Sequence, residues 1–247
     1  MNIKINKYSG CNLNGHRLVF KTVCYKFEYE EDKRILDIIL ARGYDLAAKV
    51  NPATANYGDM NRLPERIKRN CVAGILAEYC WKHFINKRAK SEIVLETEFS
   101  GASKQIDLTT KNTNKKIEVR SSFPRNGIEF ALFNHKFQFD VLGPYFNTVK
   151  PQEIQKDYYV RTLYPYDSKC IFQCINTSIE VFLTGGATWG MMFDPRISKI
   201  KNLIPDDEII DHARKSMYKV VPLSLACDTI SIVDMIIKEG IKGDIGL

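Results

Sequence analysis

Residues 103–122 read SKQIDLTTKNTNKKIEVRSS, and the predicted fold is built outward from this stretch. Two short runs in which apolar residues alternate, 105–109 and 116–121, flank a polar turn at 111–114. The turn is rich in Asn, Thr and Lys, which are common between strands. Strand-like runs on both sides of such a cluster predict a β-hairpin.

Each predicted strand of this hairpin carries a carboxylate. Asp107 lies in the first run and Glu118 in the second, each between two apolar residues. Because side chains alternate between the faces of a strand, Lys116, Glu118 and Arg120 should project from the same face. Carboxylates at the edge of an apolar core are costly unless a cation neutralises them. A divalent metal would do so, because hard cations bind carboxylate oxygens.

An Asp followed after about ten residues by Glu-x-basic resembles the core motif of the PD-(D/E)XK nuclease superfamily. The resemblance implies a restriction-endonuclease-like fold, in which the Asp and the Glu hold Mg²⁺. In that family, a Lys two residues after the Glu helps to position and polarise the attacking water. The order of predicted helices and strands is in keeping with such an α/β (α+β) architecture, a mixed central sheet flanked by helices.

The chain departs from the family motif at two positions. Ile106 stands in place of the Pro before the Asp, and Arg120 stands in place of the Lys. Arginine does not deprotonate in proteins, so Arg120 cannot act as a base, but its guanidinium can orient water or stabilise phosphate charge. Lys116 should lie on the same strand face and is the alternative basic residue.

A further carboxylate comes from the helix predicted over residues 64–86. Glu78 falls at the edge of the apolar stripe of this helix. The surrounding GILAEY resembles the G-x-x-x-E helix that precedes the hairpin in many members of the superfamily, where the Glu joins the metal site. The alternative is a surface ion pair with Lys82, one helical turn further on.

The resemblance therefore implies a complete candidate site. Its carboxylates should converge on one Mg²⁺ position, for which Mn²⁺ can substitute. The implied metal ligands are Glu78, Asp107, Glu118 and the main-chain carbonyl of Val119; the implied catalytic residues are Glu78, Asp107, Glu118 and Arg120. Lys116, Arg125 and Arg69 are the candidate contacts to DNA phosphates, although basic clusters on helices are often only solvated faces.

The remaining elements are predicted from apolar periodicity. We expect an N-terminal accessory segment over residues 1–60 and the nuclease domain over 61–247. Strands are predicted within 1–30 and at 92–99, 157–164, 169–175, 178–188 and 217–226; helices are predicted at 31–49, 127–140 and 229–241, with short helical pieces in 194–215.

Composition limits the class of protein. No apolar run is long enough to span a membrane, and the N-terminus lacks the apolar core of a signal peptide, so we expect a cytoplasmic protein. The seven cysteines include no C-x-x-C pair, which favours reduced thiols over a zinc site. The formal net charge of +7 favours a polyanionic partner.

These observations lead to one main functional hypothesis and two alternatives. The main hypothesis is a Mg²⁺-dependent DNA endonuclease of the restriction or genome-defence type, acting as a homodimer because one site cuts one strand. The first alternative is a catalytically inactive nucleic-acid-binding protein on the same fold. The second is a structural or partner-binding protein in which Asp107 and Glu118 are ordinary charges on the strand surface.

The basic charge generates the first testable prediction. If phosphate contacts dominate DNA binding, affinity should fall by about 10³-fold or more between 50 and 200 mM salt, because binding releases condensed counterions. Fluorescence anisotropy with a labelled duplex measures this dependence. Equal affinity at the two salt concentrations would contradict phosphate as the main contact.

Overall fold

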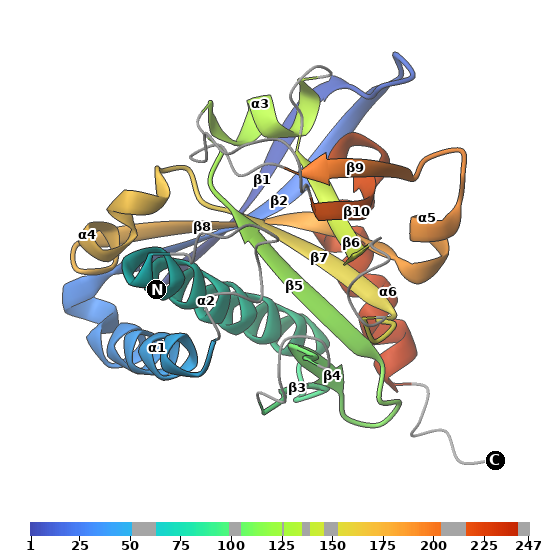
Figure 1. Ribbon diagram of the computed structural model, residues 1–247. Coiled ribbons are helices and arrows are strands. Elements are labelled where there is room, and N and C mark those ends of the chain that lie inside the picture. The colour runs from blue at the N-terminus through green and yellow to red at the C-terminus, as the bar shows by residue number, and fades with distance from the viewer. Residues whose placement is uncertain are drawn as a thin grey trace.

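The computed structural model describes residues 1–50, 63–98, 105–124, 126–134, 139–145, 153–203 and 216–241. These residues form a seven-stranded mixed sheet, a three-stranded sheet and helices that flank them (Figure 1). The predicted class, a mixed central sheet flanked by helices, is confirmed. None of the described helices is long and apolar enough to cross a membrane.

The large sheet has the strand order β1-β2-β8-β7-β5-β4-β3, and β5 and β7 are its parallel neighbours. The small sheet is antiparallel, with the order β6-β10-β9. The strands are β1 (Asn2–Cys11), β2 (Arg17–Glu28), β3 (Val94–Glu96), β4 (Leu108–Thr110), β5 (Lys116–Ser122), β6 (Asp140–Tyr145), β7 (Tyr158–Leu163), β8 (Ser178–Thr188), β9 (Lys199–Leu203) and β10 (Ser216–Pro222). The helices are α1 (Tyr29–Lys49), α2 (Pro64–Ala89), α3 (Gly127–Phe133), α4 (Ile171–Ile175), α5 (Trp189–Phe193) and α6 (Thr229–Ile241).

The predicted hairpin is present as β4 and β5. Leu108 lies opposite Ile117 in antiparallel register. The turn closes through a hydrogen bond from the Thr110 N–H to the Lys115 carbonyl, at 2.9 Å. Asn114 has a φ of 52° in this turn, a left-handed conformation that Asn adopts more readily than most residues. The polar turn residues thus direct the chain back so that the second strand pairs with the first.

Alternation along the strands builds a core on each face of the large sheet. On one face, Ile117, Val119 and Val160 join the apolar side chains of α1, α2, α4 and α6. On the other face, Tyr159 and Leu163 pack with side chains from α3, α5 and the small sheet. Because Glu118 and Arg120 alternate with Ile117 and Val119, they belong to this second face.

The N-terminal residues contribute to the same sheet. β2 pairs with β8 along residues 23–28, and α1 packs against α2, beside which it lies in Figure 1. Residues 1–50, which the sequence prediction sets apart as an accessory segment, therefore share hydrogen bonds and a core with the rest of the described chain.

Two local predictions were wrong. Residues 169–175, predicted as a strand, form a short 3₁₀ turn followed by α4. The Asp167 carboxylate accepts a hydrogen bond from the Lys169 N–H at the start of this turn, and Ile171 and Ile175 are both buried at helical spacing. Within 194–215, where short helical pieces around Pro195 and Pro205 were predicted, residues 199–203 form β9 because β10 pairs with them. In addition, the helix predicted over 127–140 ends at Phe133.

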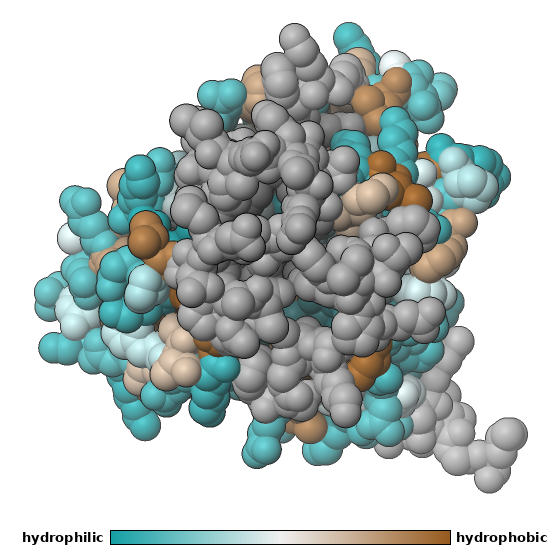
Figure 2. Space-filling view, viewed as in Figure 1, coloured by the Kyte–Doolittle hydropathy of each residue, from teal (hydrophilic) through white to brown (hydrophobic). Residues whose placement is uncertain are grey.

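Figure 2 shows how hydrophilic and hydrophobic residues are distributed over one face of the molecule. Hydrophilic residues make up most of the coloured surface there, and hydrophobic residues form separate spots. The coloured part of this face therefore shows the mixed polar surface expected of a folded domain in contact with water.

The packing of α1 on α2 generates a stability prediction. A Cβ atom at Gly43 would lie 2.4 Å from Val72 Cγ2 and 2.8 Å from Val72 Cα, so the helices would have to move apart. We expect Gly43→Ala to lower the free energy of unfolding by about 1–3 kcal/mol.

Gly74→Ala is the matched control, because a Cβ there meets no atom within 4 Å. Alanine is the better helix former, so the control should gain about 0.5–1 kcal/mol. Urea unfolding of both variants provides the test, and a stabilising Gly43→Ala would contradict the close contact.

Candidate active site around strand β5

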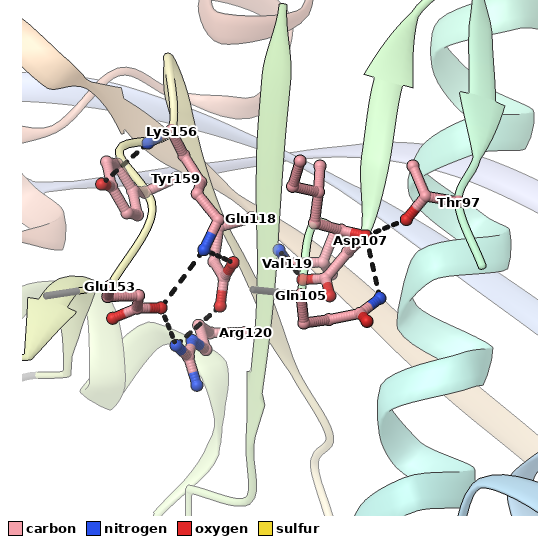
Figure 3. A network of polar contacts seen from close by, with 10 residues as sticks. Thr97, Gln105, Asp107, Glu118, Val119, Arg120, Glu153, Lys156 and Tyr159 are labelled. Atoms are coloured by element: carbon pink, nitrogen blue, oxygen red, sulfur yellow. Dashed lines mark hydrogen bonds and ion pairs between the residues drawn. The ribbon is translucent and has the colours of Figure 1, made fainter. Parts of the chain in front are cut away.

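The site begins where β4 and β5 stop pairing through their backbones. The last pair of the ladder at this end is Leu108 with Ile117. Asp107 lies immediately before β4, and its Oδ2 accepts a hydrogen bond from the Val119 N–H at 2.7 Å (Figure 3). The Asp107 carboxylate therefore accepts the hydrogen bond that the Val119 N–H would otherwise donate to a backbone carbonyl of the neighbouring strand. Asp107 and Glu118 are both buried, with 8% and 5% of their surface exposed.

Glu118 is held by two cations. Arg120 Nη2 lies 2.6 Å from Glu118 Oε1, and Lys156 Nζ lies 2.9 Å from Glu118 Oε2. Both cations also contact Glu153 Oε1, at 3.1 Å from Arg120 and 3.3 Å from Lys156. The result is a compact group of two carboxylates and two cations beside β5, called here the charge cluster (Figure 3).

The parallel pairing of β5 with β7 brings this cluster together. Glu118 is opposite Tyr159 in the register, so the residues that enter β7 lie next to it. The Asp157 carboxylate accepts a hydrogen bond from the Lys116 N–H at 2.8 Å and fixes this entry point. The Lys156 N–H donates to the Tyr159 hydroxyl at 3.4 Å, a weak bond at that length, and the Lys156 side chain is only 1% exposed.

A second arginine lies beside Arg120. Arg161 is the register partner of Arg120 on β7 and is 2% exposed. Its Nη2 donates to the Ser122 hydroxyl at 2.6 Å, whereas Nε and Nη1 have no hydrogen-bond partner within the described ranges. Burial, with a smaller contribution from Arg120, lowers the pKa of Arg161 to about 10, against the opposing effect of Asp140. This face of the sheet thus holds guanidinium groups next to the carboxylates.

The carboxylates of Glu78 and Asp107 interact with each other electrostatically. Burial and then the charge of Asp107 raise the pKa of Glu78 well above its usual range. Burial and then the charge of Glu118 raise the pKa of Asp107 to about 8, although the hydrogen bond from Val119 opposes this shift. Lys82, the alternative partner of Glu78, lies 3.2 Å from Glu96 instead.

Among the described residues, the carboxylates of the site outnumber the cations that form ion pairs with them. In the charge cluster, Glu118 and Glu153 are matched by Arg120 and Lys156. By contrast, neither Glu78 nor Asp107 forms an ion pair with the described part of the chain. A cation bound between them would oppose both pKa shifts, because a nearby positive charge favours the ionised carboxylate.

The donors fit a hard divalent cation in their chemistry. Carboxylate oxygens are preferred ligands of Mg²⁺, and Mn²⁺ uses the same donors. Within the described ranges, however, no group of three His, Cys, Asp or Glu side chains is placed to hold a metal ion. Arg120 and Lys156 take up the two Glu118 oxygens, so metal binding by Glu118 requires the exchange of one of these contacts.

The other predicted site residues are more distant or outside the described ranges. Lys116 begins β5 and alternates onto the face of Glu118. Arg69 lies on α2 nine residues before Glu78, which corresponds to roughly 14 Å along the helix axis. Arg125 lies outside the described residues.

The sequence analysis missed Glu153, Lys156 and Arg161. The first two lie in the charged segment EIQKD that precedes β7, and Arg161 lies within an otherwise apolar strand. The available signal was a charged residue inside an otherwise apolar strand. Such a residue indicates a special role, because burying an unpaired charge is costly. The contacts of Lys156 depend on which strand pairs with β5, and the sequence does not reveal this.

Comparisons with known proteins add no relative. The chain matches no family model, no curated protein and no solved structure. Membership of the PD-(D/E)XK superfamily therefore stays a prediction from the motif.

The pKa of Asp107 generates a prediction about stability and pH. The folded-state pKa of about 8 lies above the ordinary value of 3.8, so between these values the folded state keeps a proton that the unfolded state has lost. Without a divalent ion, stability should therefore fall as the pH rises through this window. Asp107→Asn keeps an acceptor for Val119 but cannot ionise, so its unfolding midpoint should fall less between about pH 5 and 8. Thermal unfolding in a chelating buffer tests this, and equal losses in the two proteins would contradict it.

Proposed function

We propose that this protein is a metal-dependent endonuclease that hydrolyses DNA phosphodiester bonds, of the restriction or genome-defence type. The observation that carries the proposal is the buried Asp107 carboxylate, which lacks an ion-pair partner in the described chain and lies at the separation of β4 and β5, beside Glu118. Buried carboxylates without matching cations are a typical property of sites that hold a metal.

The residues of the site would divide the task between them. Asp107 and Glu118 would hold Mg²⁺ or Mn²⁺, with Glu78 and the Val119 carbonyl as further donors. The bound ion would neutralise charge on the scissile phosphate and lower the pKa of a bound water. Arg120, whose side chain is 26% exposed, would stabilise the phosphate charge, since a guanidinium matches phosphate oxygens in geometry.

DNA is the proposed substrate because the chain is basic and the site combines carboxylates with guanidinium groups. The net charge of +7 would favour approach to a polyanion. One such site cuts one strand, so cleavage of both strands would require two copies of the chain.

One observation favours a second candidate, a nucleic-acid-binding protein without catalytic activity. Both oxygens of Glu118 are occupied by Arg120 and Lys156, which compete with a metal for this carboxylate. Salt-sensitive DNA binding without cleavage in Mg²⁺ or Mn²⁺ would support this candidate and overturn the proposed nuclease.

Cleavage assays on mixed DNA and RNA, with and without Mg²⁺ and Mn²⁺, test the proposal. We expect metal-dependent cleavage of DNA by the wild-type chain and a loss of about 100-fold or more in Asp107→Asn and Glu118→Gln, because metal ligation and charge stabilisation would be lost. Thermal unfolding of each variant should accompany the assay, since Glu118→Gln disrupts buried ion pairs.

The matched control is Glu65→Gln. Glu65 forms an exposed i,i+3 pair with Lys68 at the start of α2, and such surface pairs contribute little to stability. Its cleavage rate should equal that of the wild type. Full activity in Asp107→Asn would show that the nuclease site is not at β5.

A further inference from the structure

Two cations contact Glu118, and they differ in their access to solvent. The Lys156 side chain is 1% exposed, whereas the Arg120 side chain is 26% exposed. A phosphate that approaches the site can therefore reach the guanidinium of Arg120, but not the buried ammonium of Lys156. Any effect of Lys156 on a reaction must pass through the groups that its ammonium contacts, and in the described part of the chain these are Glu118 and Glu153.

Lys156 is well placed to fix the direction of the Glu118 carboxylate. Its ammonium forms an ion pair with Oε2 at 2.9 Å, an oxygen that has no hydrogen-bond partner among the described residues, whereas Arg120 Nη2 lies 2.6 Å from Oε1. Glu153, at 3.3 Å, holds the ammonium from a second direction. Asp157 is tied to β5 twice: its N–H donates to the Lys116 carbonyl at 2.9 Å, and its carboxylate accepts from the Lys116 N–H at 2.8 Å. The base of the Lys156 side chain is therefore fixed relative to the strand that carries Glu118.

Stability alone gives little reason for this arrangement. A buried ion pair loses much of its Coulomb attraction to the cost of desolvation, and apolar residues of similar volume often replace such pairs without loss. A buried lysine in contact with a candidate metal ligand is instead suited to orienting that ligand. Groups of this kind, which support a ligand from behind, often control metal affinity and activity.

We infer that Lys156 is a positioning residue that holds Glu118 in the orientation required for metal-dependent hydrolysis, while Arg120 is the cation that meets the phosphate. The inference rests on the proposed function. In the family motif a single lysine stands at this position. Here Lys156 would orient Glu118, Arg120 would contact the phosphate, and Lys116 would be dispensable.

The test compares Lys156→Met with Lys156→Gln in the full chain. Methionine fills the buried volume without a strong hydrogen-bond donor, whereas glutamine keeps an N–H donor for Glu118 without the charge. If Lys156 orients Glu118, Lys156→Met should lower kcat about 100-fold, the scale expected for a misplaced reacting group, and Lys156→Gln should retain more activity than Lys156→Met. KM for DNA should change by less than about threefold in both, since the buried ammonium does not touch DNA.

Mn²⁺ binding to the DNA-free protein, followed by calorimetry, provides a readout that does not depend on activity. If Lys156 orients Glu118 for a metal, Lys156→Met should weaken Mn²⁺ binding about 10-fold or more, as expected when a group that supports a ligand is lost, whereas removal of a cation that only competes for Glu118 Oε2 would tighten it. Lys115→Met is the matched control: Lys115 pairs with Asp157 at 3.1 Å in a partly exposed position, and its loss should change neither kcat nor Mn²⁺ affinity.

The outcomes separate the inference from the function. Activity in Lys156→Met that equals or exceeds that of Lys156→Gln would reduce the lysine to a packing role and overturn the inference. Mn²⁺ affinity in Lys156→Met that is unchanged or higher than in the wild type would overturn it as well. Loss of activity in Lys116→Ala, with full activity in Lys156→Met, would assign the role to Lys116 instead. A wild-type chain that neither binds Mn²⁺ nor cuts DNA would overturn the proposed function and this inference with it.

Discussion

The parallel pairing of β5 with β7 is the constraint on which the candidate site depends. Parallel neighbours cannot be joined by a tight turn, so the chain must leave β5, cross the sheet and return. The segment between Ser122 and Tyr158 makes this crossing and includes α3 and β6. Because paired residues of parallel strands point to the same face, the crossing places Arg161 beside Arg120 and brings Lys156 to Glu118.

The buried charges at this pairing are not what holds the fold together. Apolar side chains fill both faces of the large sheet, and Trp81, Tyr25 and Leu36 are fully buried on the α2 face alone. Burial of such large side chains contributes about 1.5–3 kcal/mol each, whereas a buried ion pair often contributes little net stability. The apolar core therefore stabilises the fold and holds the charge cluster in place, whereas the charge cluster itself adds little stability.

The N-terminal strands have a structural part in this arrangement. β2 pairs with β8, and β8 pairs with β7, so the first described residues extend the sheet from the side opposite to β4. Without β2, the β8 edge would present unpaired backbone groups, which are prone to unwanted pairing. The helix α1 that follows covers part of α2, the helix that carries Glu78. Residues 1–50 thus stabilise the elements that present the site.

Local patterns in the sequence predicted the hairpin, the long helix α2 and the positions of most strands along the chain. Alternation around Ile117 and Val119, and the polar turn before them, are short-range patterns that predict the hairpin of β4 and β5. The same patterns identified Glu78, Asp107 and Glu118, because carboxylates at the edge of apolar runs stand out in any sequence. They failed at residues 169–175, where apolar and polar residues mix in a way that suits either a short helix or a strand.

Only the tertiary structure decided which cations meet these carboxylates. Lys156 and Glu153 lie more than thirty residues from Glu118 along the chain, and strand order, not local sequence, makes them neighbours. The predicted alternative of an ion pair between Glu78 and Lys82 likewise depended on distant contacts, because in the structure Lys82 pairs with Glu96 on β3. Short-range patterns fix which side chains leave a strand on which face, but contacts between distant segments depend on the packing of the whole sheet.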